Sequence, residues 1–201
     1  GLNRLYQKEA TDILQTSHVI IAGVGGVGSW CVEAFARSGI GHLTLIDLDV
    51  VAESNINRQL PALSSTLGES KIEVMAKRIQ EINEQCKVTL IDDFLTEENL
   101  DELLLSQFDS KNTWIVDAID NVRVKAALIA WAKRNKFKII VSGAAGGKID
   151  PQSFKLDDLS KTYHDPLCAS LKATLKKKYN LGKDNAKFNV PTVFSTENMQ
   201  G

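Results

Sequence analysis

Apolar residues fall into five short runs rich in β-branched side chains, and most runs precede a segment where apolar residues recur every three or four positions. The runs predict strands over residues 18–23, 42–47, 87–92, 113–118 and 138–143. The periodic segments predict helices near residues 27–38, 71–83, 97–107 and 121–135. Apolar strands that alternate with helices are typical of a parallel sheet covered on both faces. Right-handed crossovers then make the predicted fold a doubly wound, Rossmann-like α/β structure with a mostly parallel sheet.

The pattern is different at the two ends of the chain. Residues 1–16 are predicted to form a helix ahead of the first strand. After Gly147 the periodicity weakens, and one clear helix follows over residues 165–180, with Asp165 as its N-cap and Pro166 at its first position. We therefore divide the chain into a core, residues 1–150, and a small C-terminal extension, residues 151–201.

Composition narrows the class of protein without naming a function. The 201 residues are 43% hydrophobic and 24% charged, with a net charge of −1, so no global field favours a nucleic acid or a membrane. No apolar run approaches the ~20 residues of a membrane span. Cys31, Cys86 and Cys168 form an odd, widely spaced set that fits a reducing compartment, and we predict a cytoplasmic protein.

A glycine cluster follows the first predicted strand and opens the first predicted helix. Gly23, Gly25, Gly26 and Gly28 lie where a phosphate-binding loop is expected, because glycine lets the backbone turn tightly and approach a phosphate. Asp47 ends the second strand 19 residues beyond Gly28, near the spacing of an acid that binds ribose hydroxyls. This pair of features fits NAD, FAD, S-adenosylmethionine or ATP.

The next segment separates these ligands. Asp49, Asn55 and Arg58 follow Asp47, and Lys71 opens the next helix. Hydride transfer develops no charge on phosphate, whereas substitution at the α-phosphate of a nucleotide gathers negative charge that fixed cations stabilise. Taken singly, Arg58 could pair with Glu53 and Lys71 could face solvent. Together, after the ribose acid, they favour nucleotidyl transfer.

Two acids close the fourth predicted strand. Asp117 and Asp120 lie at the carboxyl end of a parallel strand, where ligands of doubly wound folds bind. A carboxylate there can hold Mg²⁺ together with substrate phosphates. Asn121, like Asp120, has an alternative role as the N-cap of the following helix.

The ordered set G-x-G-G-x-G, D-x-D, N-x-x-R, a helix-opening Lys and D-x-x-D-N resembles the ubiquitin-activating-like adenylating enzymes of the ThiF and MoeB type. The resemblance covers residues 1–150 and implies that this core is an ATP-binding adenylation domain. It implies that Gly26 lines the phosphate loop, that Asp47 holds ribose and that Asp120 and Asn121 face ATP, with Asp120 on Mg²⁺. It also implies that Asp49, Asn55, Arg58 and Lys71 lie at the nucleotide. Arg4 resembles an arginine that reaches the partner subunit's ATP site, which implies a homodimer.

Segments outside the nucleotide core resemble one branch of that superfamily. The sequences of residues 143–151, 156–167 and 193–197 are similar to those of the tRNA threonylcarbamoyladenosine dehydratase family. That resemblance implies ATP-dependent cyclisation of the modified adenosine beside a tRNA anticodon, and a cysteine desulfurase or sulfur-transfer partner. Candidate tRNA contacts, from charge and position, are Lys172, Lys176, Lys177, Lys178 and Lys183.

Departures from the wider family leave alternatives open. The three cysteines form no C-x-x-C pair, so we expect no structural zinc site of the kind found in MoeB and ThiF. Family members continue beyond residue 197, so we expect a truncated extension, with any further cysteine or membrane contact in the residues beyond. The main alternative function is adenylation of the C-terminal glycine of a ubiquitin-like sulfur carrier. An NAD-dependent oxidoreductase and an idle nucleotide-binding scaffold are the others.

Overall fold

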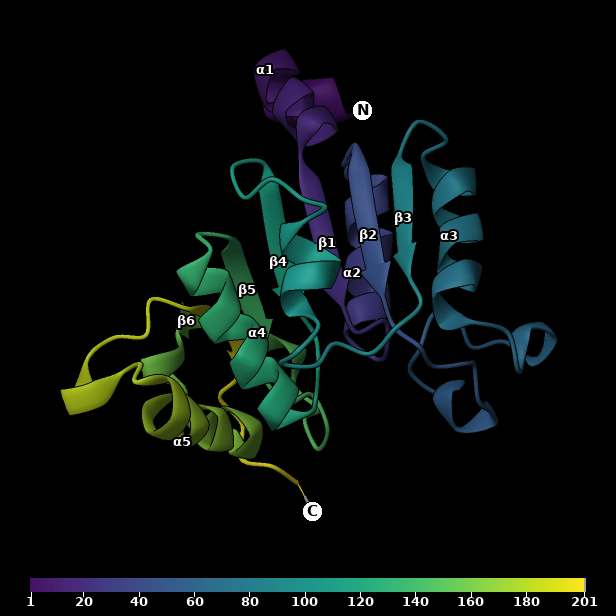
Figure 1. Ribbon diagram of the computed structural model, residues 1–201. Coiled ribbons are helices and arrows are strands. Elements are labelled where there is room, and N and C mark those ends of the chain that lie inside the picture. Colours follow the sequence, from purple (N-terminus) through teal and green to yellow (C-terminus); the bar gives the residue numbers. More distant parts are fainter. Residues whose placement is uncertain (201) are drawn as a thin grey trace.

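A computed structural model describes residues 1–200 as a seven-stranded sheet with helices on both faces (Figure 1). The strands are β1 (His18–Ala22), β2 (His42–Ile46), β3 (Lys87–Ile91), β4 (Thr113–Asp117), β5 (Lys138–Ser142), β6 (Phe154–Asp158) and β7 (Pro191–Ser195). The helices are α1 (Leu2–Thr16), α2 (Gly28–Arg37), α3 (Lys71–Ile82), α4 (Val122–Arg134) and α5 (Pro166–Tyr179). The five predicted strands and the doubly wound α/β class are confirmed.

The strand order is β3-β2-β1-β4-β5-β7-β6, and every neighbouring pair is parallel except β6 and β7. From β1 the chain adds β2 and β3 on one side, and it then returns to add β4 and β5 on the other side. The order of the strands therefore reverses between β1 and β4. Ligands of such sheets bind at this reversal, beyond the carboxyl ends of the strands. The glycine loop after β1 and the acids at the carboxyl end of β4 therefore lie side by side.

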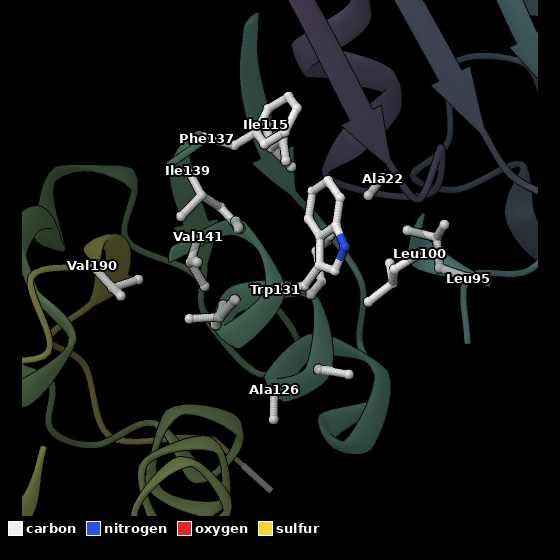
Figure 2. Close-up of a cluster of buried hydrophobic side chains, with 14 of the residues drawn as sticks. Ala22, Leu95, Leu100, Ile115, Ala126, Trp131, Phe137, Ile139, Val141 and Val190 are labelled. Carbon is white, nitrogen blue, oxygen red and sulfur yellow. The ribbon is translucent and has the colours of Figure 1, made fainter. Parts of the chain in front are cut away.

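Strand β1 serves both faces of the core because its side chains alternate. Ile20 and Ala22 pack with α4 and α5, whereas Val19 and Ile21 pack with α2 and α3. Figure 2 shows the first cluster, in which the Trp131 indole of α4 lies among aliphatic side chains of β5 and of the segment before β4. This two-sided burial explains why β1 is apolar from Val19 to Ala22.

The helix predicted over residues 97–107 is wrong in extent. Only a five-residue π-helical turn, η3 (Asp101–Leu105), forms there. The Asn99 side chain accepts from Thr96 N at 2.8 Å and donates to Phe94 O at 2.8 Å, and such local bonds compete with helix formation. Trp131 Nε1 donates to Asp101 Oδ1 at 2.7 Å, which fixes the turn against α4.

The C-terminal extension contributes two strands that the sequence analysis did not identify. β7 inserts between β5 and β6, and β6 forms the sheet edge. The predicted late helix is confirmed as α5, with Pro166 first and Asp165 Oδ1 accepting from Cys168 N at 2.8 Å. The division of the chain at residue 150 stays a prediction. Among residues 1–200, no helix has the length and apolar character needed to cross a membrane.

Candidate functional site

The glycine loop brings α2 directly against β1. Gly23 has φ +88°, a conformation that favours glycine, and a Cβ on it would lie 3.0 Å from Ala118 O. A Cβ on Gly28 would lie 1.8 Å from Gly23 O, so no larger residue fits where the helix begins. Gly25 and Gly26 line a cavity of about 1040 Å³ at the carboxyl edge of the sheet. The loop thus lines the cavity, and its contact with a phosphate stays a prediction.

Asp47 holds this loop in place. Its two carboxylate oxygens accept from Val24 N at 2.8 Å and from Asp49 N at 2.9 Å. Each oxygen retains a lone pair, because a carboxylate can accept about four hydrogen bonds. Asp47 lines the cavity, and its contact with ribose stays a prediction.

Arg58 lies over the glycine loop. A Cβ on Gly26 would meet Arg58 Cγ at 3.4 Å, and the guanidinium Nη1 donates to Ser54 O at 2.9 Å and to Asn57 Oδ1 at 2.8 Å. The alternative ion pair with Glu53 is absent from the described residues. The remaining donors of Arg58 are therefore available to an anion in the cavity.

Lys71, the first residue of α3, is turned inward. Its side chain is 6% exposed, and Nζ lies 3.2 Å from Asp49 Oδ2, with both residues lining the cavity. The solvent-facing alternative is wrong, because Asp49 and the cavity draw the ammonium toward the glycine loop. A buried cation with one carboxylate partner keeps two N–H donors for a second anion.

Asn55 and Asn121, two of the residues predicted to bind ATP, have structural roles. Asn55 ends the short helix η1 (Glu53–Asn55), is 9% exposed and accepts from Ala52 N at 3.0 Å, so it shapes the turn that carries Arg58. Neither Asn55 nor Gly28 is among the described residues that line the cavity. Asn121 does line it and is also the N-cap of α4, accepting from Val124 N at 3.2 Å.

The two acids at the carboxyl end of β4 have different environments. Asp117 has no exposed side-chain surface and pairs with the equally buried Lys125, whose Nζ lies 3.0 Å from Asp117 Oδ1. Lys125 also donates to the carbonyl oxygens of Asp117 at 3.2 Å and Ile119 at 2.9 Å. Burial raises the pKa of Asp117, and the Lys125 ammonium opposes that rise. Asp120, at the end of this pinned segment, is exposed and lines the cavity.

The remaining candidates lie outside the cavity. Arg4 is exposed on α1, at the edge of the sheet opposite the glycine loop (Figure 1). Lys172 Nζ donates to Thr162 O at 2.8 Å, and Lys178 Nζ lies 2.5 Å from Glu97 Oε2. Lys177, and Lys183 in the short helix η6 (Lys183–Asn185), are exposed, and Lys176 is partly buried.

Several cavity residues escaped the sequence analysis. Gln59 follows Arg58 and is 9% exposed, and its Oε1 is buried without a hydrogen-bond partner. Segments 93–96 and 142–146, with Leu167 of α5, complete the wall of the cavity. The one signal in the sequence was that Gln59 directly follows a candidate cation. This signal is too weak to identify a site residue, because single glutamines are common on protein surfaces.

The three thiols are free and are poor nucleophiles at neutral pH. Cys86 and Cys168 are buried and Cys31 is half-buried. Burial raises the pKa of each, that of Cys168 to about 12, with Asp165 adding to the rise. The thiolate is the reactive form, so these cysteines have the character of core residues.

Fold and site together define a nucleotide-binding α/β protein whose phosphate loop is flanked by an arginine and an inward-turned lysine. The chain belongs to the ThiF family, whose model matches residues 2–192. It is 49% identical to the tRNA threonylcarbamoyladenosine dehydratase of Haemophilus influenzae over 98% of this chain and 74% of that protein. It is 32% identical to the molybdopterin-synthase adenylyltransferase of Escherichia coli over 71% of this chain and 55% of that protein. A crystal structure of the Escherichia coli tRNA N6-threonylcarbamoyladenosine dehydratase with ATP superposes with a TM-score of 0.94 at 46% identity, covering 99% and 81% of the two chains.

Proposed function

We propose that the protein uses ATP to dehydrate N6-threonylcarbamoyladenosine in tRNA, closing a ring on the modified base. The observation that carries this proposal is the placement of Arg58 and Lys71 on one cavity with Gly25 and Gly26. The similarity to threonylcarbamoyladenosine dehydratases over 98% of the chain supports the choice of substrate. The shorter match to the molybdopterin-synthase enzyme weighs against a carrier-protein substrate.

The proposed reaction has two steps. The threonyl carboxylate attacks the α-phosphorus of ATP. The bond from this phosphorus to the oxygen of the β-phosphate breaks, pyrophosphate departs, and an acyl-adenylate is formed. The carbamoyl group of the same modification then attacks the activated carbonyl, loses a proton and displaces AMP. The net result is ring closure with loss of water, whose oxygen leaves on AMP.

The cations of the site supply the stabilisation that this chemistry requires. Arg58 and Lys71 lie where negative charge gathers on the transferring phosphate, and Asp47 binds the ribose. Asn55 positions Arg58 through its turn, and Asn121 holds the start of α4 beside the nucleotide.

A magnesium ion fits this donor set. Asp120 presents an exposed carboxylate to the cavity, and Asp49 presents a second, paired with Lys71. Mg²⁺ prefers such oxygen ligands together with substrate phosphates, and when bound it would neutralise charge on the pyrophosphate. Asp120 is the residue that we assign to hold it.

The second step requires no enzyme thiol. The attacking carbamoyl group is tethered to the activated carboxyl, so proximity replaces a covalent enzyme intermediate. The raised pKa values of Cys31 and Cys168 agree with this.

Partners follow from the same proposal. Lys176, Lys177 and Lys183 are the lysines best placed to contact the tRNA backbone, because Lys178 is paired with Glu97. Lys172 donates one bond to Thr162 O and retains two N–H donors. We also propose a homodimer in which Arg4 reaches the partner's ATP site, since α1 is remote from the cavity of its own chain. A sulfur-transfer partner is implied by family resemblance.

ATP–pyrophosphate exchange tests the proposed function. Exchange is measured with modified tRNA, with unmodified tRNA and with a ubiquitin-like carrier protein as the added substrate. We expect exchange with modified tRNA alone. Exchange with the carrier protein alone would replace the proposed substrate.

Two variants test the phosphate roles. Arg58→Ala and Lys71→Ala should each lower turnover by at least ~100-fold, the scale of losing one transition-state charge contact. Lys77→Ala is a matched control, because Lys77 lies on the same helix with a 73% exposed side chain. Near wild-type rates for both Arg58→Ala and Lys71→Ala would remove the assigned roles.

A further inference from the structure

We propose that a second cavity, of about 440 Å³ beside the first turn of α5, binds a nucleobase and its phosphate from the RNA next to the modified adenosine. This inference rests on the proposed function and extends it to a further part of the same substrate. The cavity is lined by an aromatic ring, an imidazole, a lysine and a methionine, from Tyr163, His164, Lys172 and Met199. The proposed adenylation chemistry uses none of these side chains.

Tyr163 supplies a stacking surface that is already fixed. The residue is 45% exposed in spite of its size. The ring stands edge-on to Phe194, with centroids 5.6 Å apart, and edge-on to His164 at 5.0 Å. Phe194 is buried at 1% exposure, so Tyr163 is anchored to the core of the sheet. A rigid exposed ring loses little conformational entropy when a base stacks on it.

His164 is held in an unfavourable conformation beside this ring. Its φ is +55°, in the left-handed region that non-glycine residues seldom adopt. Its Nδ1 lies 2.8 Å from Thr196 O, and because a carbonyl oxygen can only accept, Nδ1 is the donor. Its own carbonyl accepts from Lys148 Nζ at 2.9 Å. The bond to Thr196 places the proton of the neutral ring on Nδ1 and leaves Nε2 as an acceptor, suited to an exocyclic amino group of a base, while the bond from Lys148 holds the backbone.

The charge of the cavity favours an anion. Lys172 Nζ donates one bond to Thr162 O at 2.8 Å and retains two N–H donors. The acid in the lining, Asp165, is 4% exposed, and its oxygens accept from Ala144 N at 2.9 Å and from Cys168 N at 2.8 Å. The negative charge of Asp165 is therefore stabilised by backbone N–H donors inside the protein. At the mouth of the second cavity, Lys172 makes the electrostatic potential positive.

The first turn of α5 borders both cavities. Pro166 lines the second cavity and Leu167, the next residue, lines the nucleotide cavity. Asp165 bonds both to the start of α5 and to Ala144, which lines the nucleotide cavity. A nucleotide in the first cavity and its neighbour in the second would thus straddle a rigid element. Recognition of RNA through unstacked bases placed on aromatic rings is common for single-stranded loops.

The tail of an acidic carrier protein is the competing occupant. Such a tail would use Lys172 but would gain little from the flat face of Tyr163, and an apolar contact of leucine would serve it equally. The geometry favours the base, because the fixed ring and the free imidazole nitrogen match a flat heterocycle with polar edges.

Three substitutions of one residue separate these readings. Tyr163→Ala should raise the KM for modified tRNA by about tenfold or more, the scale of losing one base stack, and leave the KM for ATP unchanged. Tyr163→Phe should behave as wild type. Tyr163→Leu should behave as Tyr163→Ala, because it restores bulk without a ring. The free modified nucleoside, which has no neighbouring base, should react equally with all four proteins.

The outcomes also separate this inference from the proposed function. If the wild-type protein shows no exchange with modified tRNA, the proposed function fails. If it does and Tyr163→Ala or Tyr163→Leu matches wild type on tRNA, the base subsite is overturned while the function stands. An equal loss on tRNA and on the free nucleoside, or a loss confined to binding of a carrier protein, likewise overturns the subsite. Thermal unfolding of each variant identifies any that fails to fold. If Tyr163→Ala fails to fold, the comparison of Tyr163→Leu with wild type decides the question.

Discussion

Replacing Lys125 with methionine should destabilise the protein strongly without touching the surface. Lys125 and Asp117 are both fully buried, and the ammonium has three acceptors within 3.2 Å, two of them backbone carbonyls of the segment that ends in Asp120. Methionine fills a similar volume but donates no hydrogen bond. The substitution therefore leaves a buried carboxylate and two carbonyl oxygens without their partner.

The expected loss in the free energy of unfolding is about 3–5 kcal/mol, the range for removing one member of a buried ion pair. Asp117 would retain the bond from Ile119 N at 3.1 Å, while its Oδ2 already lacks a partner. For a protein of this length, ~1 kcal/mol shifts the melting temperature by roughly 2–4 °C, so the loss corresponds to roughly 6–20 °C.

The loss should shrink in acid. Burial raises the pKa of Asp117, and Lys125 is the group that opposes the rise. In Lys125→Met the folded-state pKa of Asp117 lies further above its unfolded value, so the folded state binds a proton that the unfolded chain does not. The free energy of unfolding of the variant then rises, relative to wild type, as the pH falls through that raised pKa.

Urea denaturation of wild type, Lys125→Met, Asp117→Asn and the double variant measures these quantities. The double variant should lose clearly less than the sum of the single losses, because it removes both charges. A loss below ~1 kcal/mol for Lys125→Met, or additive single losses, would refute the reasoning.

Three further outcomes are expected. Alanine at Lys176, Lys177 and Lys183 should weaken tRNA binding and flatten its dependence on salt, and an unchanged salt slope rejects the contact. Burial lowers the pKa of His18 to about 3 from 6.5, so the unfolded chain takes up its proton first on acidification. The free energy of unfolding should therefore fall by about 2–4 kcal/mol between these pH values, less so in His18→Gln, as urea titrations can measure. Gly28→Ala should abolish ATP binding, because the added Cβ would overlap Gly23 O and displace the loop. Gly146→Ala is the control: a Cβ there meets no atom within 4 Å, so the melting temperature should stay at the wild-type value.

The parts of the site that could be predicted are those set by local patterns. The glycine loop lies between an apolar strand and a helix that follow each other in sequence, so Gly25 and Gly26 could be placed at once. Lys71 opens a periodic helix and could be placed near the loop, although its burial could not. Asp165 and Pro166 marked the start of α5 by capping chemistry alone.

The parts that could not be predicted depend on contacts between distant segments. The ion pair of Asp117 and Lys125 depends on a turn beside the cavity whose carbonyl oxygens accept from one ammonium. The sequence placed Asp117 at the ligand-binding end of its strand but gave no sign of a partner on the following helix. Residues 93–96 and 142–146 line the cavity because β3 and β5 end at the same edge of the sheet. β7 pairs with strands that precede it by some 30 residues or more, so its place in the sheet leaves no local signal.

The position of β7 sets an order on synthesis at the ribosome. The five parallel strands from β1 to β5 are complete once Ser142 has emerged, and each pairs with a strand already made or the next to arrive. β6 has no partner until residues 191–195 appear, because β7 alone joins it to the sheet. His164 likewise waits for Thr196. The nascent chain therefore carries an assembled phosphate loop while the edge of the sheet, and the second cavity with it, is still unfinished.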